Sequence, residues 1–463
     1  MDAYVHGSGE RTPQPRSSHH EVVVVGGGIA GLIAGWNLRD RDVLVLEANE
    51  RAGGRVSSVS SGPYWLNLGA HTIAWTDGLL RQYARALGLL LVVPRGSMMA
   101  VAMGGRLIRA SRPEELPFRL PLAPAARASL VRVGIRLRRA YRAVTRAERS
   151  GQFGAAARID HMAVDPALDD QSYGDVLGPM HPDVAALMRV TANRMGTEPD
   201  RVSGHKGVWN ALGVWGTRRA NVVGGNSVLT DALAATLGGR VWTGATVRRI
   251  AQTASEVAVD VDARGHSERL TADACIVTVP APAARELVDG LPSEKDGALS
   301  RIPYGPYVVA GMFTSETEPM PWDDVYAVAV PGRSFSMLFN PANPLRTGLR
   351  RPGGGLVVYA AGDPAADLLP LSDEAITDRF LGDLHDVLPA TRGLVRDVMI
   401  QRWPVGIPIA APGRARLQPQ LAAPCGRVHF AGDYIGEPGL DSAAWTAEVA
   451  AQSVRDMLPE RTG

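Results

Sequence analysis

The fold is decided by residues 21–38, which read EVVVVGGGIAGLIAGWNL. Four β-branched residues in a row suit a strand that is buried on both faces of a parallel sheet. The glycines that follow have the spacing G-x-G-x-x-G: Gly26 allows a tight turn, Gly28 leaves room for a pyrophosphate, and Gly31 lets the next helix pack close to the strand. The amino end of that helix would offer free N–H groups to phosphates. This stretch therefore predicts a Rossmann-like, dinucleotide-binding unit of α/β class.

A second apolar run ends in an acidic residue. Residues 43–46 read VLVL and lead directly into Glu47. An acid at this place, roughly twenty residues beyond the first glycine, binds the ribose hydroxyls of a dinucleotide. The alternative is an acid on a solvated strand end. As a ribose ligand, the carboxylate would favour a free diol and repel a 2′-phosphate.

The residues after Glu47 narrow the choice of cofactor. Residues 47–55 read EANERAGGR, which follows the pattern E-A-x-x-R-x-G-G-R. Together with the glycine turn, this segment resembles the flavin amine oxidase superfamily, which includes monoamine oxidases, protoporphyrinogen oxidases and phytoene desaturases. The resemblance implies non-covalent FAD, bound by a discontinuous Rossmann-like domain into which an α+β substrate domain is inserted. It also implies that Gly54 and Arg55 wrap the FAD pyrophosphate.

Further segments extend the resemblance. Gly69 and Ala70 match a turn beside the isoalloxazine ring, so His71 is expected close to the flavin; the alternative is a histidine that is hydrogen-bonded to backbone. Asn67 stands where the family often has an acid. Val247 matches the residue that clamps the adenine through its backbone.

The C-terminal segment supplies a second FAD motif. Gly432 and Asp433 follow an apolar strand. In the resemblance, Asp433 matches the acid that binds the ribityl and pyrophosphate region. The last helix would present its first amides, near Leu440, to flavin O2. The resemblance thus implies one set of cofactor-binding residues: Gly26, Gly28, Ile29, Ala30, Gly31, Glu47, Ala48, Arg51, Gly53, Gly54, Arg55, Gly69, Ala70, His71, Val247, Gly432, Asp433, Leu440 and Asp441.

The same motifs divide the chain into alternating segments. We expect a disordered polar tail over residues 1–20, because this stretch is rich in Gly, Pro, Ser and His. The expected FAD-binding segments are 21–75, 221–295 and 420–463. The expected substrate-domain segments are 76–220, mostly helical, and 296–419.

Composition excludes several classes of protein. The 463 residues carry a net charge of only +2, so no global field favours nucleic acid. Two cysteines, Cys275 and Cys425, are too few for a disulfide framework or a Cys-rich zinc site, and we expect no metal. The sequence shows no signal-peptide pattern and no apolar run long enough to cross a bilayer, which indicates a cytoplasmic protein.

Residues 130–149 form an amphipathic stretch with a basic stripe. Leucine, valine and tyrosine recur there at helical spacing beside Arg132, Arg136, Arg139, Arg142 and Arg146. One interpretation is a solvated helix face. The other is contact with an anionic membrane surface or an acidic substrate group, which would make the protein peripheral to the membrane.

Departures from the family bear on the chemistry. Many amine-oxidising relatives place a lysine near flavin N5, but the only lysines are Lys206 and Lys295, outside the matching segment 304–310. Gly439 stands where amine oxidases often have a tyrosine. These differences favour the protoporphyrinogen oxidase and desaturase branch, which Trp403 in an Arg-Trp-Pro stretch also resembles.

The predicted function is FAD-dependent oxidation, in which a hydride passes to flavin N5 from a C–N or activated C–C unit of a hydrophobic small molecule. Oxygen or another acceptor would reoxidise the flavin. His71 and Trp403 are the candidate catalytic residues, as floor and wall of the substrate pocket. Two alternatives stay open: a flavin-dependent isomerase or mutase, and a binding protein similar to the Rab GDP-dissociation inhibitors.

Overall fold

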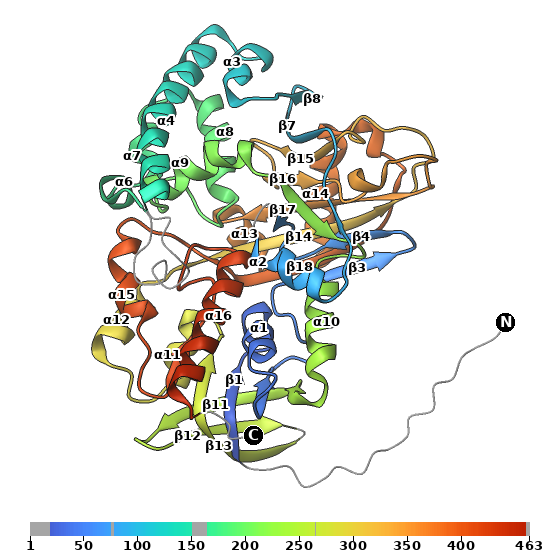
Figure 1. The fold of residues 1–463 in the computed structure, drawn as a ribbon. Coiled ribbons are helices and arrows are strands. Elements are labelled where there is room, and N and C mark those ends of the chain that lie inside the picture. Colours follow the sequence, from blue (N-terminus) through green and yellow to red (C-terminus); the bar gives the residue numbers. More distant parts are fainter. Residues whose placement is uncertain (1–18, 76–77, 151–163, 264, 460–463) are drawn as a thin grey trace, which may run out of the picture.

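The computed structural model describes residues 19–75, 78–150, 164–263 and 265–459 (Figure 1). Residues 1–18 of the expected tail lie outside this description. The end of the tail prediction is wrong, because His19 and His20 already belong to the first strand, β1 (His19–Val25). They pair with Thr271 and Ala272 of β13 (His266–Val277), so strand pairing rather than local composition sets where β1 begins.

The first sheet gathers three separated parts of the chain. Its strand order is β10-β2-β1-β13-β12-β11, with β19 paired to β13. Strands β10, β2, β1, β13 and β19 run parallel, whereas β11, β12 and β13 form an antiparallel meander. This arrangement confirms the predicted α/β class and Rossmann-like sheet. The other strands are β2 (Val43–Leu46), β10 (Val241–Trp242), β11 (Ala245–Gln252), β12 (Val257–Ala263) and β19 (Val428–Phe430).

Strand β1 is buried on both faces, as its valines require. Val22 and Val24 pack into the core on the side of helices α1, α10 and α16, while Val23 and Val25 pack on the opposite side with α11, α12 and α15. Alternate side chains of a strand point to opposite faces, so four consecutive valines serve both layers. The helices are α1 (Ile29–Asn37), α10 (Ser227–Leu237), α11 (Ala281–Leu287), α12 (Ser293–Ser300), α15 (Gln418–Ala422) and α16 (Leu440–Met457).

The second sheet lies between the first sheet and a layer of helices (Figure 1). Its strand order is β18-β14-β17-β16-β15-β7-β8. Strands β7 (Ser97–Met103) and β8 (Arg106–Arg109) come from the segment 76–220, which was predicted to be mostly helical and whose other described elements are chiefly helices. They belong to this sheet because β7 pairs in parallel with β15, far away in sequence. The remaining strands are β14 (Tyr304–Thr314), β15 (Val325–Ala329), β16 (Met337–Phe339), β17 (Gly354–Ala361) and β18 (Val395–Pro408).

The helical layer includes α4 (Pro124–Ser150), which carries the basic stripe. Its apolar residues Leu130, Val133, Leu137 and Val144 are buried in the core. The side chains of Arg132, Arg139, Arg142 and Arg146 are exposed, whereas that of Arg136 is half-buried and donates to the carbonyl of Leu177 at 2.5 Å. The other helices here are α3 (Leu116–Arg119), α6 (Pro166–Asp170), α7 (Tyr173–Leu177), α8 (Pro182–Asn193) and α9 (Gly204–Leu212).

Short elements join the layers around the site. The most important is β9 (Arg219–Val222), which lies between β5 (Ile73–Ala74) and β6 (Leu91–Val92) in a small antiparallel sheet. Across the described ranges, no helix combines the length and the apolar character that a bilayer crossing requires. Further elements are β3 (Ser58–Ser61), β4 (Tyr64–Asn67), α2 (Leu79–Ala86), α13 (Asp363–Leu368) and the longer helix α14 (Asp373–Val387).

Candidate functional site

One cavity of about 1400 Å³ runs from the glycine turn after β1 to the face of the second sheet. Pockets for a single drug-sized ligand usually measure about 300–1000 Å³. The cavity therefore has room for a dinucleotide and a second molecule. It is lined by all but one of the sequence-predicted site residues: Gly26, Gly28, Ile29, Ala30, Glu47, Ala48, Arg51, Gly53, Gly54, Arg55, Gly69, Ala70, His71, Val247, Trp403, Gly432, Asp433, Leu440 and Asp441.

Gly31 is the one predicted residue outside the cavity lining, and the geometry explains why. A Cβ on Gly31 would lie 1.8 Å from the carbonyl oxygen of Gly26, so only glycine lets α1 pack this close to the turn. Gly26 has a φ of +106°, a conformation that side chains rarely adopt. A Cβ on Gly28 would meet nothing nearer than the Cα of Gly54, at 4.0 Å, so the cradle between these two turns is open.

Glu47 is held rigidly at the carboxyl end of β2. It is buried, and its two carboxylate oxygens accept separate backbone hydrogen bonds, from the Gly27 N–H at 2.8 Å and the Asn49 N–H at 2.9 Å. A carboxylate offers about four lone-pair sites. The side chain of Asn49 occupies a third site, because its Nδ2 donates to Oε1 at 2.5 Å. One acceptor position thus stays available to a hydroxyl group of a ligand in the cavity.

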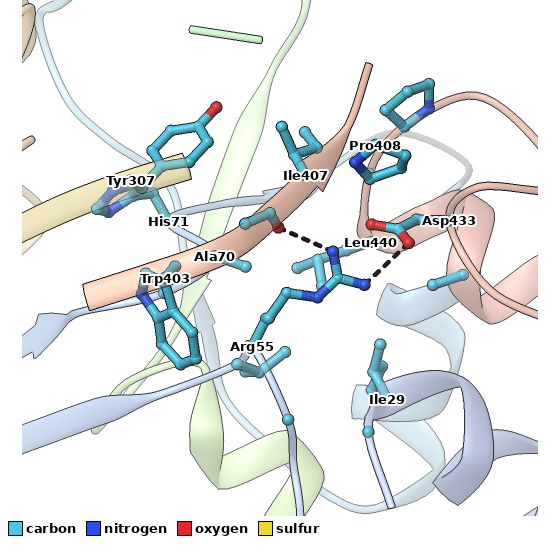
Figure 2. Close-up of a pocket in the computed structure, with 18 of the residues that line it drawn as sticks. Ile29, Arg55, Ala70, His71, Tyr307, Trp403, Ile407, Pro408, Asp433 and Leu440 are labelled. Atoms are coloured by element: carbon cyan, nitrogen blue, oxygen red, sulfur yellow. Dashed lines mark hydrogen bonds and ion pairs between the residues drawn. The ribbon is translucent and has the colours of Figure 1, made fainter. Parts of the chain in front are cut away.

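Arg55 ties three distant parts of the chain together (Figure 2). Its guanidinium donates to the carboxylate of Asp433 at 2.9 Å and to the carbonyl of Gly406 at 2.8 Å. Burial lowers the pKa of Arg55, but the charge of Asp433 and the hydrogen bond to it outweigh this effect, and the pKa is raised. The neighbouring Arg51 donates to the carbonyls of Ala52 and Gly54 and so braces the same turn.

Aromatic side chains form the far end of the cavity, which we call the aromatic chamber: His71, Tyr307, Phe339, Tyr359 and Trp403. The His71 ring stacks on Phe339 with centroids 4.4 Å apart and on Tyr359 at 5.4 Å. Trp403 is fixed by a hydrogen bond from its Nε1 to the carbonyl of Leu68 at 2.7 Å. Figure 2 shows His71, Tyr307 and Trp403 on one side of Arg55 and Asp433 on the other.

His71 is a neutral aromatic surface rather than a hydrogen-bonded histidine. Burial lowers its pKa to about 4, so the imidazole carries no charge at neutral pH. Within the described chain its ring nitrogens have no protein partner, and the ring is held by stacking. The alternative of a backbone-bonded ring is therefore wrong.

Asn67 holds the turn that carries His71. Its Nδ2 donates to the carbonyl of His71 at 3.1 Å and to Oδ1 of Asn221 at 2.8 Å. Its Oδ1 accepts from the N–H of Asn226 at 2.9 Å and from the hydroxyl of Ser58 at 2.8 Å. The amide that replaces the family's acid is thus the centre of a buried network that fixes the turn.

Sequence reasoning missed a group of charged residues in the cavity: Arg194, Lys206, Arg219 and Glu437. Arg194 ends α8, Arg219 begins β9, and Lys206 on α9 forms an ion pair with Glu437 before α16. A basic residue at the end of a helix ordinarily interacts with the helix dipole, so Arg194 gives no distinctive sequence signal. Only the packing of α8 and β9 against the second sheet brings them to the cavity.

The cavity fits FAD in shape and chemistry. Its lining offers an open glycine cradle, an acid beyond the second strand and the amino end of the 18-residue helix α16. Two buried oxygens at that helix end, Oδ1 of Asp441 and Oγ of Ser442, have no hydrogen-bond partner among the described residues. Neither cysteine belongs to the described lining, and no cluster of metal-ligating side chains occurs in the described ranges.

Comparisons with known proteins agree over nearly the whole chain. Residues 29–455 match the family model for flavin containing amine oxidoreductases. An L-amino-acid oxidase from Demansia vestigiata is 24% identical over 470 residues, which cover 95% of this chain and 87% of that protein.

Solved structures share the fold. The structure of cyclohexylamine oxidase from Brevibacterium oxydans IH-35A superposes with a TM-score of 0.73 at 20% identity, covering 95% of this chain and 99% of that one. A candidate protoporphyrinogen oxidase from Exiguobacterium sp. 255-15 gives a TM-score of 0.70 at 17% identity, covering 96% and 100%.

Proposed function

The chain belongs to the flavin-containing amine oxidoreductases and is an FAD-dependent oxidoreductase, and from this premise we propose that it oxidises a carbon–nitrogen bond of a small-molecule amine. The observation that carries the proposal is the continuity of the cavity from the glycine cradle to the aromatic chamber. A relative that covers 95% of the chain is named an L-amino-acid oxidase, which supports an amine substrate over an isomerase or a flavin-free binding protein.

When bound, FAD supplies the acceptor for the electrons and hydrogen that leave the substrate. The chain's own residues position and shield the reactants. The side chain of Glu47 would hold the ribose hydroxyls, and the Arg55–Asp433 pair would lie at the pyrophosphate region. The positive end of the α16 dipole lies at the cavity, where it would stabilise negative charge on the ring.

The aromatic chamber would bind the substrate beside the flavin ring. Trp403 forms a fixed wall through its bond to Leu68, and His71 contributes a flat neutral floor. A ring nitrogen of neutral His71 can accept a hydrogen bond from a substrate N–H. Val309 of β14 lines the chamber, and the described part of this strand contains no lysine, so proton transfer here would not use one.

The proposal is tested with purified holoenzyme. We expect a yellow protein whose flavin is released by acid precipitation, which reports non-covalent binding. Anaerobic titration with a panel of amines should bleach the visible spectrum, and admission of oxygen should restore it with formation of hydrogen peroxide. Bleaching by C–C substrates but by no amine would replace this proposal with desaturation, which the missing lysine favours.

A second proposal concerns the outer face of α4. Exposed arginines lie there beside the exposed apolar side chains of Val131 and Ile135, a pattern that suits peripheral contact with an anionic bilayer. We expect cosedimentation with phosphatidylserine vesicles at low salt, reduced by Arg139→Glu, and none with neutral vesicles. Failure to bind anionic vesicles at low salt would identify the stripe as a solvated face.

A further inference from the structure

Two arginines that face the cavity have no carboxylate partner. Arg194 and Arg219 both line it, and no acidic side chain in the described ranges lies within ion-pair distance of either. Among the described residues, the Arg194 guanidinium donates one hydrogen bond, to the carbonyl of Asn210 at 3.5 Å, the limit for such a bond. Arginine stays protonated in proteins, so both charges persist in the cavity.

Arg194 belongs to the substrate end of the cavity. Its carbonyl accepts a hydrogen bond from the hydroxyl of Tyr307 at 3.0 Å, and the phenol of Tyr359 lies close enough to affect the pKa of its guanidinium. Tyr359 in turn stacks against His71 in the aromatic chamber. This places Arg194 beside the chamber and away from the cradle, where Arg55 is already neutralised by Asp433.

The charges around the chamber do not balance. Lys206 is neutralised by Glu437. The acid whose charge reaches Arg219 is Asp441, and the two do not form an ion pair. Burial lowers the pKa of Arg194, and the charge of Arg219 lowers it further, so the two cations repel each other. Two arginines against one acid leave one positive charge in this part of the cavity, which a monoanion would neutralise.

We propose that the substrate carries a carboxylate, which Arg194 binds with Arg219 in support, while its apolar part lies against His71, Phe339 and Tyr359. A guanidinium presents two parallel N–H donors that match a carboxylate, which accounts for arginine rather than lysine at this place. The inference rests on the proposed function: an amine that also bears a carboxylate is an amino acid. The sequence predicts a hydrophobic small molecule, and this proposal adds a carboxylate to it.

The test measures equilibrium binding to the holoenzyme, by calorimetry and by perturbation of the flavin spectrum, with two isosteric probes: benzoate and benzamide. We expect benzoate to bind at least about tenfold more tightly than benzamide. Arg194→Met should weaken benzoate by about tenfold or more and leave benzamide unchanged, and Arg194→Lys should recover part of the loss. Arg218→Met, which removes an exposed arginine next to Arg219, is the matched control and should have no effect.

Equal affinities for benzoate and benzamide would overturn the inference, as would unchanged benzoate affinity in Arg194→Met. If Arg194→Met does not fold, the benzoate affinities of Arg194→Lys and Arg219→Met decide instead, and wild-type benzoate affinity in both variants would overturn the inference. The assay measures binding and needs no turnover. The carboxylate site and the proposed amine oxidation can therefore be refuted independently of each other. A holoenzyme that oxidises simple amines but does not discriminate benzoate refutes only the carboxylate site. One that binds benzoate through Arg194 but oxidises no amine refutes the proposed function.

Discussion

Replacing Glu47 by glutamine should weaken FAD binding through a defined mismatch. Both carboxylate oxygens accept backbone N–H groups, from Gly27 at 2.8 Å and Asn49 at 2.9 Å. An amide has one oxygen and one NH₂, so Glu47→Gln must turn a donor toward one of these N–H groups. It also removes the negative charge that would accept the ribose hydroxyls, while shape and volume are kept.

The expected loss follows from the kind of bond. Hydrogen bonds to a charged group contribute about 1.5–3 kcal/mol each. If one such bond to FAD is lost, the affinity should fall by about one to two decades. Glu47→Ala should give a similar loss or a larger one, because it also leaves the Gly27 N–H without its acceptor.

The assay is reconstitution of apoprotein with FAD, followed by quenching of flavin fluorescence and by calorimetry. Thermal unfolding of each apoprotein separates weakened binding from loss of the fold. Glu50→Gln is the matched control, because Glu50 is exposed on the same loop and should leave affinity unchanged. Wild-type FAD affinity in Glu47→Gln would show that the carboxylate serves only the loop and does not contact the ribose.

The remaining predictions concern the aromatic chamber. Trp403→Phe should slow flavin reduction by substrate while FAD stays bound, because the bond to Leu68 that fixes the wall is lost; rapid-mixing absorbance measures this, and an unchanged rate would remove Trp403 from the site. The pKa of His71 is lowered by burial from 6.5 to about 4, so the unfolded chain binds more protons between these values and the residue costs stability as the pH falls through them. His71→Phe should therefore raise the free energy of unfolding in urea by about 2 kcal/mol more at about pH 5 than at about pH 7.5. An equal rise at both pH values would contradict the lowered pKa of His71. Asn67→Asp should destabilise by about 1–3 kcal/mol, because a second acceptor would then face the His71 carbonyl; unchanged thermal unfolding would refute this account of the network.

Local sequence was enough to predict which residues line the glycine-rich end of the cavity. The glycine turn, the acid at Glu47 and the turn ending in Arg55 lie within one continuous βαβ stretch, and their spacing encodes their geometry. Asp433 lies 378 residues after Arg55, yet the strand before it is recognisable by itself. The cavity-lining positions of these residues therefore follow from short patterns.

The substrate half could not be predicted in the same way. Strand β7 exists because it pairs with β15, more than two hundred residues away in sequence, as the Ser97 and Val325 register shows. The aromatic chamber combines His71 with residues of β14, β16 and β17, and the charges of Arg194 and Arg219 meet only after α8 and β9 have packed. Pairing and packing across such separations leave no spacing for a sequence pattern to detect.

Strand β9 connects the turn that carries His71 with Arg219 of the charged group. Arg219 begins this strand and pairs with Ala74 of β5, directly after the turn that carries His71. Two residues further along, Asn221 accepts the amide of Asn67, which holds the same turn from its other side. The backbone of the arginine proposed to support the substrate carboxylate and the turn that carries His71 are therefore attached to one small sheet. If Arg219 supports the carboxylate as proposed, loss of the β5–β9 pairing should disturb both ends of the substrate site together.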